Sequence, residues 1–168
     1  MILIVESGST KADWVLLDGV NTISSFQTKG WNPLFLSSEL MILRLKSYSE
    51  LKTVFTKILE VHFYTPGCSN PSSFNILESS LKSFFVNANV IIKTDLYAAA
   101  RAAYNGKPLF VSILGTGSNT AFYNGESIDQ LKPSLGYVMG DEGSGASLGR
   151  LLLRSYLYQN LPAALHLE

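Results

Sequence analysis

The alternation of hydrophobic and polar positions predicts three antiparallel strands at the start of the chain. Apolar residues at Ile2 to Val5 and from Asp13 to Leu17 flank a polar turn, which is typical of a β-hairpin. The Asp18-Gly19 turn signal then leads into Thr22 to Lys29 as a third strand. The pattern ends at Gly30-Trp31-Asn32-Pro33, because proline cannot donate a hydrogen bond to a sheet.

Helical spacing and further strands follow this loop. Ser38 to Lys46 is predicted as a helix, and a capping box at Ser47 and Glu50 predicts a second helix across residues 51–58. Glu60 to Tyr64 alternates as a strand does. Asn70 then caps a helix with proline in its first turn. Five large apolar residues line one face of that helix: Phe74, Leu77, Leu81, Phe84 and Phe85.

Asp95 lies at a predicted junction between a strand and a helix. Asn89 to Lys93 is typical of a short buried strand, and the Ala-rich run from Leu96 to Tyr104 predicts a helix. The order β-β-β-α-β-α-β-α indicates a mixed α/β sheet instead of a doubly wound parallel one. From the residues alone, Asp95 is as consistent with a plain helix cap as with a catalytic base.

The pattern begins again in the last third of the chain. Leu109 to Leu114 is a predicted strand that ends in the turn Gly115-Thr116-Gly117-Ser118-Asn119, followed by a strand at Thr120 to Tyr123. Leu135 to Met139 is a further predicted strand, and Ala146 to Leu157 a helix. The repeated hairpin predicts two similar domains that face each other. Small residues in such turns let backbone N–H groups approach an anion, so we expect a carboxylate base facing a phosphate cradle.

Composition excludes several classes of protein. The formal net charge is +0 and no long basic run occurs, so nucleic acid is not expected as a partner. Cys68 is the only cysteine, which excludes a disulfide framework or a Cys-based metal cluster within one chain. No apolar run approaches the roughly 20 residues of a membrane span, and the start lacks the features of a signal peptide. We therefore expect a cytoplasmic protein without a membrane partner.

Four motifs in a fixed order resemble those of one family. They are Glu6-Ser7-Gly8-Ser9-Thr10-Lys11, Thr94-Asp95, Gly115-Thr116-Gly117-Ser118-Asn119 and Met139-Gly140-Asp141-Glu142-Gly143-Ser144. This order is similar to that in N-acetylglucosamine kinases and the related BadF/BadG-type ATPases, within the actin, Hsp70 and sugar kinase superfamily. The resemblance extends from Ile2 to about Leu157.

The resemblance implies two ribonuclease H-like domains, one at residues 1–114 and a truncated second at 115–168, with ATP and a sugar in the cleft between them. Asp95 would be the catalytic base, and Glu6 would position Mg²⁺ through water. The residues implied to hold the nucleotide phosphates are Gly8, Ser9, Thr10, Lys11, Thr116 and Gly117. Those implied to contact the sugar are Asn32, Ser118, Asn119 and Asp141.

The chain departs from the family pattern in two ways. The family's Gly-Trp-Gly-His stretch is Ser134-Leu135-Gly136-Tyr137 here, so the identity of the sugar stays open. Family members also continue through an adenosine pocket and a C-terminal helix, so we expect this chain to be an N-terminal fragment that is inactive alone. A homodimer is an arrangement that the residues leave open.

The preferred hypothesis is ATP-dependent phosphorylation of an amino sugar, in particular of N-acetylglucosamine at its 6-hydroxyl. Asp95 needs only to orient the sugar hydroxyl and take its proton late, so a near-normal pKa is sufficient for this role. Its place at the start of a helix is expected to keep the carboxylate ionised. The main alternative is an ATP-hydrolysing activator of the BadF/BadG type that acts on a protein partner. A third is a nucleotide-binding or sugar-sensing protein without catalysis, against which the presence of Asp95 and Glu6 argues.

Overall fold

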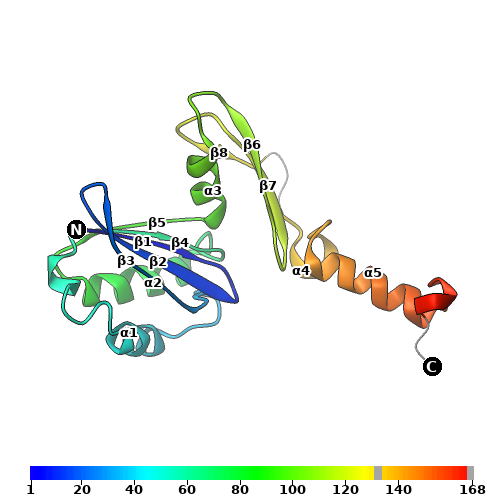
Figure 1. The fold of residues 1–168 in the computed structure, drawn as a ribbon, viewed down its shortest axis with the longest axis horizontal. Helices are drawn as coiled ribbons and strands as arrows, with labels where there is room; N and C mark the ends of the chain where they lie inside the picture. The colour runs from blue at the N-terminus through cyan, green and yellow to red at the C-terminus, as the bar shows by residue number, and fades with distance from the viewer. Residues whose placement is uncertain (131–133, 166–168) are drawn as a thin grey trace. The chain divides into compact units, whose positions relative to one another are not determined.

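Two separate sheets organise the chain, one in each of the units into which it divides, Met1–Ala98 and Ala99–Glu168. The computed structural model describes residues 1–130 and 134–165 (Figure 1). The domain division after residue 114 stays a prediction, because close packing alone does not define an evolutionary domain. No helix among the described residues is both long and apolar enough to cross a membrane.

The first unit is built on a five-stranded mixed sheet in the order β3-β2-β1-β4-β5. Its strands are β1 (Ile2–Ser7), β2 (Lys11–Asp18), β3 (Asn21–Lys29), β4 (Glu60–Tyr64) and β5 (Asn89–Lys93). The first three strands pair antiparallel, whereas β4 pairs parallel to both β1 and β5. The mixed α/β sheet predicted from the sequence is therefore confirmed.

Two helices, α1 (Ser38–Ser47) and α2 (Pro71–Phe84), pack together on one side of this sheet (Figure 1). Their contact includes a 2.9 Å hydrogen bond between the hydroxyls of Ser38 and Ser80. The predicted cap of α2 is confirmed, because the side chain of Asn70 accepts hydrogen bonds from the first backbone N–H groups of the helix. Helix α3 (Asp95–Ala103) follows β5 directly.

The core of the first unit lies between this sheet and the two helices. Alternate residues of the strands, such as Leu3, Val5 and Trp14, are fully buried, as the period of two in a strand requires. Trp14 contacts Trp31 edge to face, with ring centroids 5.7 Å apart. These rings fix the loop after β3 against the sheet.

The predicted second helix across residues 51–58 is wrong. The structure has turns there and only a short 3-10 helix, η1 (Phe55–Lys57). Ser47 is the last residue of α1, and its hydroxyl donates to the carbonyl of Arg44 instead of capping a new helix. Leu51 and Ile58 are buried, so their apolar spacing reflects anchoring of a loop.

The second unit has a three-stranded antiparallel sheet in the order β6-β7-β8. Its strands are β6 (Leu109–Leu114), β7 (Ser118–Tyr123) and β8 (Ile128–Asp129). A turn at Asn124-Gly125 joins β7 to β8, and Gly125 adopts a φ of +104°, which glycine tolerates best. The side-chain oxygen of Asn124 accepts hydrogen bonds from the backbone N–H groups of Glu126 and Ser127 at 2.9 and 2.8 Å, which stabilise this turn.

Three helical segments complete the second unit: α4 (Gly136–Met139), α5 (Gly145–Leu157) and η2 (Ala163–Leu165). The predicted strand at Leu135 to Met139 is wrong, because these residues form the single turn of α4. Gly136 has a φ of +68°, and its carbonyl accepts from the N–H of Gly140, which closes that turn. The predicted helix from Ala146 to Leu157 is confirmed as α5.

Candidate functional site

The turn between β1 and β2 presents free backbone donors. The N–H of Gly8 donates to the carbonyl of Lys11 at 2.9 Å, which closes the turn. Within residues 1–130 and 134–165, the backbone N–H groups of Ser9 and Thr10 donate to no protein acceptor. Successive free N–H groups on an exposed turn form a concave site that suits an anion.

Gly30 packs directly against this turn, a contact that the sequence pattern did not reveal. Its N–H donates to the carbonyl of Thr10 at 2.9 Å. A Cβ added to Gly30 would lie 2.3 Å from the carbonyl oxygen of Gly8 and 2.6 Å from the carbonyl carbon of Ser9. Only glycine therefore lets the loop after β3 lie this close to the turn.

A buried hydrogen-bond network fixes the base of the same turn. The hydroxyl of Ser7 accepts from the N–H of Trp31 at 2.7 Å, and the hydroxyl of Thr65 donates to the carbonyl of Trp31 at 2.6 Å. Ser7, Trp31 and Thr65 are all fully buried. Residues from three separate segments thus hold the turn, and no local signal in the sequence marks them.

Replacing Ser7 with alanine is expected to lower the free energy of unfolding by about 1–3 kcal/mol, because the buried N–H of Trp31 loses its acceptor. Urea denaturation followed by tryptophan fluorescence measures this change. Ser9→Ala is the matched control, since Ser9 is exposed on the same turn, and it should shift the unfolding free energy by less than about 0.5 kcal/mol. Equal shifts in the two variants would contradict the role given to Ser7.

Asp95 begins α3 immediately after β5, as the sequence predicts. One oxygen of its half-buried carboxylate accepts from the N–H of Leu96 at 2.9 Å. Burial raises the pKa of Asp95, and this effect outweighs the backbone hydrogen bonds that lower it. The start of the helix therefore does not fully offset the desolvation of this carboxylate, and the expectation that Asp95 is ionised stays a prediction.

The carboxylate of Glu6 shares an acidic neighbourhood with Asp95. The pKa of Glu6 is raised, first because protein atoms displace part of its surrounding water, and then because the charges of Asp95 and Asp13 repel it. Lys11 offsets part of this rise. A carboxylate whose pKa is raised by neighbouring negative charges lies where a bound cation would be stabilised.

Lys11 and Asn32 each have a structural partner. The ammonium of Lys11 lies 3.1 Å from the carboxylate of Asp13. The side-chain oxygen of Asn32 accepts from the N–H of Leu34 at 3.0 Å, which forms a local turn before the short segment leading to α1. Phosphate contact by Lys11 and sugar contact by Asn32 stay predictions.

The turn between β6 and β7 has the same character as the first. The N–H of Gly115 donates to the carbonyl of Gly117 at 2.9 Å, whereas the N–H groups of Thr116 and Gly117 have no acceptor among the described residues. The carbonyls of Gly115 and Thr116 accept from Gly145 and Ala146 at the start of α5. The carbonyls are thus occupied, and the free donors of the turn remain available to an anion.

Asp141 lies against this second turn. Its carboxylate accepts from the N–H of Ser118 at 3.2 Å, and a Cβ on Gly117 would approach it to 2.8 Å. The hydroxyl of Ser118 donates to the carbonyl of Glu142 at 2.9 Å. Asn119 accepts from the amide of Gln130 at 2.8 Å. The structure brings these residues together within the second unit, and their sugar contacts stay predictions.

Within the described ranges, no group of three or more His, Cys, Asp or Glu side chains is placed to hold a metal ion directly. Burial raises the pKa of the Cys68 thiol to about 11, with a smaller contribution from the charge of Asp95. Because the thiolate is the reactive form, the raised pKa disfavours reaction of Cys68 at neutral pH.

The raised pKa of Asp95 predicts how stability depends on pH. The folded protein holds this proton more tightly than the unfolded chain, whose Asp titrates near 3.8. Stability from Asp95 is therefore fully present below pH 3.8 and falls as the pH rises through the folded pKa. The variant Asp95→Asn, which keeps the oxygen that accepts from Leu96, should be more stable than the wild type at pH 7 and lose this advantage near pH 3.5. Thermal unfolding at both values measures the difference, and a constant difference would contradict the prediction.

Comparison with known proteins confirms the fold that the residues predict. No protein-family model and no curated protein matches the chain. Among solved structures, the "Putative N-acetylglucosamine Kinase" from Porphyromonas gingivalis superposes with a TM-score of 0.87 and 37% identity, over 99% of this chain and 59% of the other. A "putative sugar kinase" from Cytophaga hutchinsonii superposes with a TM-score of 0.57 and 14% identity, over 96% of this chain and 64% of the other.

The chain therefore has the fold of the actin, Hsp70 and sugar kinase superfamily. Its resemblance to N-acetylglucosamine kinases is confirmed by the Porphyromonas gingivalis protein, which is similar over nearly the whole of this sequence. The chain spans 59% of the length of that protein.

Proposed function

We propose that the protein carrying this sequence is an ATP-dependent sugar kinase that phosphorylates an amino sugar, in particular N-acetylglucosamine at its 6-hydroxyl. The observation that carries the proposal is the 37% identity to the Porphyromonas gingivalis protein over 99% of this chain. Two exposed turns with free N–H groups and a half-buried carboxylate after β5 support it. We also propose that the 168-residue chain alone has no kinase activity.

Phosphoryl transfer requires positioning and neutralisation of charge more than covalent chemistry. In this proposal, the free N–H groups of Ser9 and Thr10 in the first unit bind phosphate oxygens of ATP, and those of Thr116 and Gly117 give the second unit a phosphate-binding turn of its own. Asp95 accepts the proton of the sugar hydroxyl as the hydroxyl oxygen bonds to the γ-phosphorus. The bond from that phosphorus to the bridging oxygen of the β-phosphate breaks, and ADP leaves with the electron pair. A raised pKa suits this role, because a general base works best when its pKa approaches the working pH.

Mg²⁺ would bind together with the ATP phosphates and not in a site made of protein ligands alone. Glu6 is the residue proposed to hold it through water, because its carboxylate is exposed and close enough to Asp95 for the two charges to interact. Magnesium commonly keeps several waters and binds through one or two carboxylates with substrate phosphates, so this acidic neighbourhood fits the ion. When bound, Mg²⁺ neutralises charge on the transferring phosphate.

The proposal is tested with the natural protein that contains these residues. It is incubated with ATP, Mg²⁺ and a panel of hexoses and N-acetylhexosamines, and the products are followed by mass. A phosphate gained by N-acetylglucosamine alone would establish the substrate and the reaction class together. ATP hydrolysis without a phosphorylated sugar would overturn the kinase proposal in favour of the activator alternative.

A further inference from the structure

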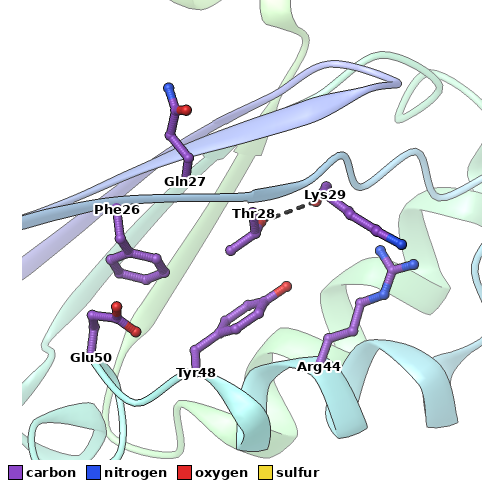
Figure 2. Close-up of a pocket in the computed structure, with 7 residues that line it drawn as sticks. All are labelled: Phe26, Gln27, Thr28, Lys29, Arg44, Tyr48 and Glu50. Carbon is purple, nitrogen blue, oxygen red and sulfur yellow. Dashed lines mark hydrogen bonds between the residues drawn. The ribbon is translucent and has the colours of Figure 1, made fainter.

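A pocket of about 300 Å³ opens between the end of β3 and α1 in the first unit (Figure 2). This volume is at the lower end of the range found for small-molecule sites. The lining side chains that matter below are Phe26, Lys29, Arg44, Tyr48 and Glu50. No residue of the two phosphate-binding turns lines this pocket.

Two aromatic rings form a rigid apolar wall. Phe26 stacks on the buried ring of Trp14, with centroids 5.6 Å apart and planes inclined by 10°. Tyr48 meets Phe26 edge to face at 5.9 Å. Because both rings are already fixed by packing, they offer a preformed surface for the apolar face of a ligand ring at little cost in side-chain entropy.

One end of the pocket is cationic. Figure 2 shows Lys29 and Arg44 extending toward each other there. Neither side chain forms an ion pair with any described residue. Arg44 donates from one nitrogen to the carbonyl of Gly30 at 3.2 Å, which holds the guanidinium in place and leaves its other donors available. Two unneutralised cations that converge on one point favour a phosphate or carboxylate group.

Tyr48 adds a further donor at the same end. Its hydroxyl oxygen accepts from the indole N–H of Trp31 at 3.1 Å, whereas its proton has no acceptor among the described residues. The hydroxyl points toward the end with the two cations (Figure 2). Glu50 lies at the other end and is exposed; one of its oxygens accepts from the hydroxyl of Ser49 at 2.9 Å, and the other can accept from a ligand hydroxyl. The pocket is therefore arranged as anion site, aromatic wall and hydroxyl acceptor in sequence.

We propose that this pocket is a second binding site, separate from the catalytic residues, for a phosphorylated sugar. The phosphate binds Lys29, Arg44 and Tyr48, the sugar ring lies on Phe26, and Glu50 accepts from a ring hydroxyl. This assignment rests on the proposed function in one respect, since a phosphorylated sugar is the product class of that reaction. A polyphosphate fits less well, because Glu50 would repel its additional charges.

The site is joined to the first phosphate-binding turn through one residue. Gly30 receives the hydrogen bond of Arg44 on its carbonyl and gives its own N–H to the carbonyl of Thr10. A ligand that draws Arg44 toward its phosphate therefore acts on the position of the turn. By thermodynamic linkage, bound sugar phosphate changes the affinity for ATP, and ATP changes the affinity for sugar phosphate by the same factor.

Isothermal titration of the natural protein with N-acetylglucosamine 6-phosphate, in the absence of ATP, tests the binding. Lys29→Gln and Arg44→Gln should each weaken binding at least about tenfold, the scale of one charge-assisted hydrogen bond. Lys29→Gln is the cleaner variant, because no described protein group accepts from the Lys29 ammonium. Lys46→Gln is the matched control, since Lys46 is an exposed cation of α1 that does not line the pocket.

Unchanged affinity in both pocket variants would place the ligand at the catalytic site and overturn the proposal. Inorganic phosphate that binds as tightly as the sugar phosphate would also overturn it, because Phe26 and Glu50 would then contribute nothing.

The apparent affinity for ATP should change on addition of sugar phosphate in the wild type but not in Lys29→Gln, and the absence of any change would contradict the link through Gly30. Binding that depends on Lys29 in a protein without kinase activity would refute the proposed function alone.

Discussion

Asp95→Asn is expected to reduce kcat by about 10²–10⁴, the contribution of a positioned general base. The amide keeps the oxygen that accepts from the N–H of Leu96, so the start of α3 should be preserved. The amide, unlike the carboxylate, cannot take the proton of the sugar hydroxyl at any pH of the assay. The affinity for the sugar should stay within a few-fold of the wild-type value, since the substitution removes a charge but changes the volume little. Steady-state kinetics and direct titration with the sugar measure the two effects separately.

Asp18→Asn provides the matched control for that result. Asp18 ends β2, is exposed, and lies on the same unit without belonging to the candidate site. Its replacement should leave kcat and KM within about twofold of the wild-type values, as expected for a surface substitution. Unchanged turnover in Asp95→Asn would remove the catalytic role. A loss of thermal stability in that variant at pH 7 would instead indicate that the carboxylate stabilises the fold, against its raised pKa.

The site residues that could be predicted from the sequence are those with local signals. Asp95 follows a strand and begins a helix, and the glycines of the two turns lie between strands of clear alternation. These features depend on neighbours a few residues away, so pattern and turn chemistry are sufficient to place them. The same holds for the five strands of the first sheet, whose bounds differ little from the predicted ranges.

The supporting contacts could not be predicted in the same way because they join distant segments. Ser7 meets Trp31 across 24 residues, and Trp31 meets Thr65 across 34. The pKa of Asp95 likewise depends on burial by the whole unit, which the residues next to it in the sequence do not reveal. In residues 51–58 and 135–139 the apolar spacing is regular, but the helix and the strand that it predicts do not form.

Gly30→Ala is expected to disrupt the turn between β1 and β2, which we propose binds phosphate, and the core next to it. The added methyl group would lie 2.3 Å from the carbonyl oxygen of Gly8, and the atoms in its way are backbone atoms that cannot rotate aside. Relief requires the turn and the loop after β3 to separate, which breaks the hydrogen bond from Gly30 to Thr10. We expect a loss of about 1–3 kcal/mol in the free energy of unfolding, the scale of overpacking in a close-packed region. ATP affinity should fall at least tenfold in the same variant, because the free N–H groups lose their arrangement.

Two other glycines separate this steric argument from a general effect of alanine. Gly149 lies inside α5 with no atom within 4 Å of an added Cβ, so Gly149→Ala should stabilise that helix by about 0.5–1 kcal/mol. A Cβ added to Gly8 has only the carbonyl oxygen of Lys11 nearby, at 3.8 Å. The free energy of unfolding of Gly8→Ala should therefore stay within about 0.5 kcal/mol of the wild-type value. Urea denaturation ranks the three variants, and titration with ATP reports on the turn. If Gly30→Ala were as stable as Gly8→Ala and bound ATP normally, the close approach of Gly30 to the turn would have no part in building the site.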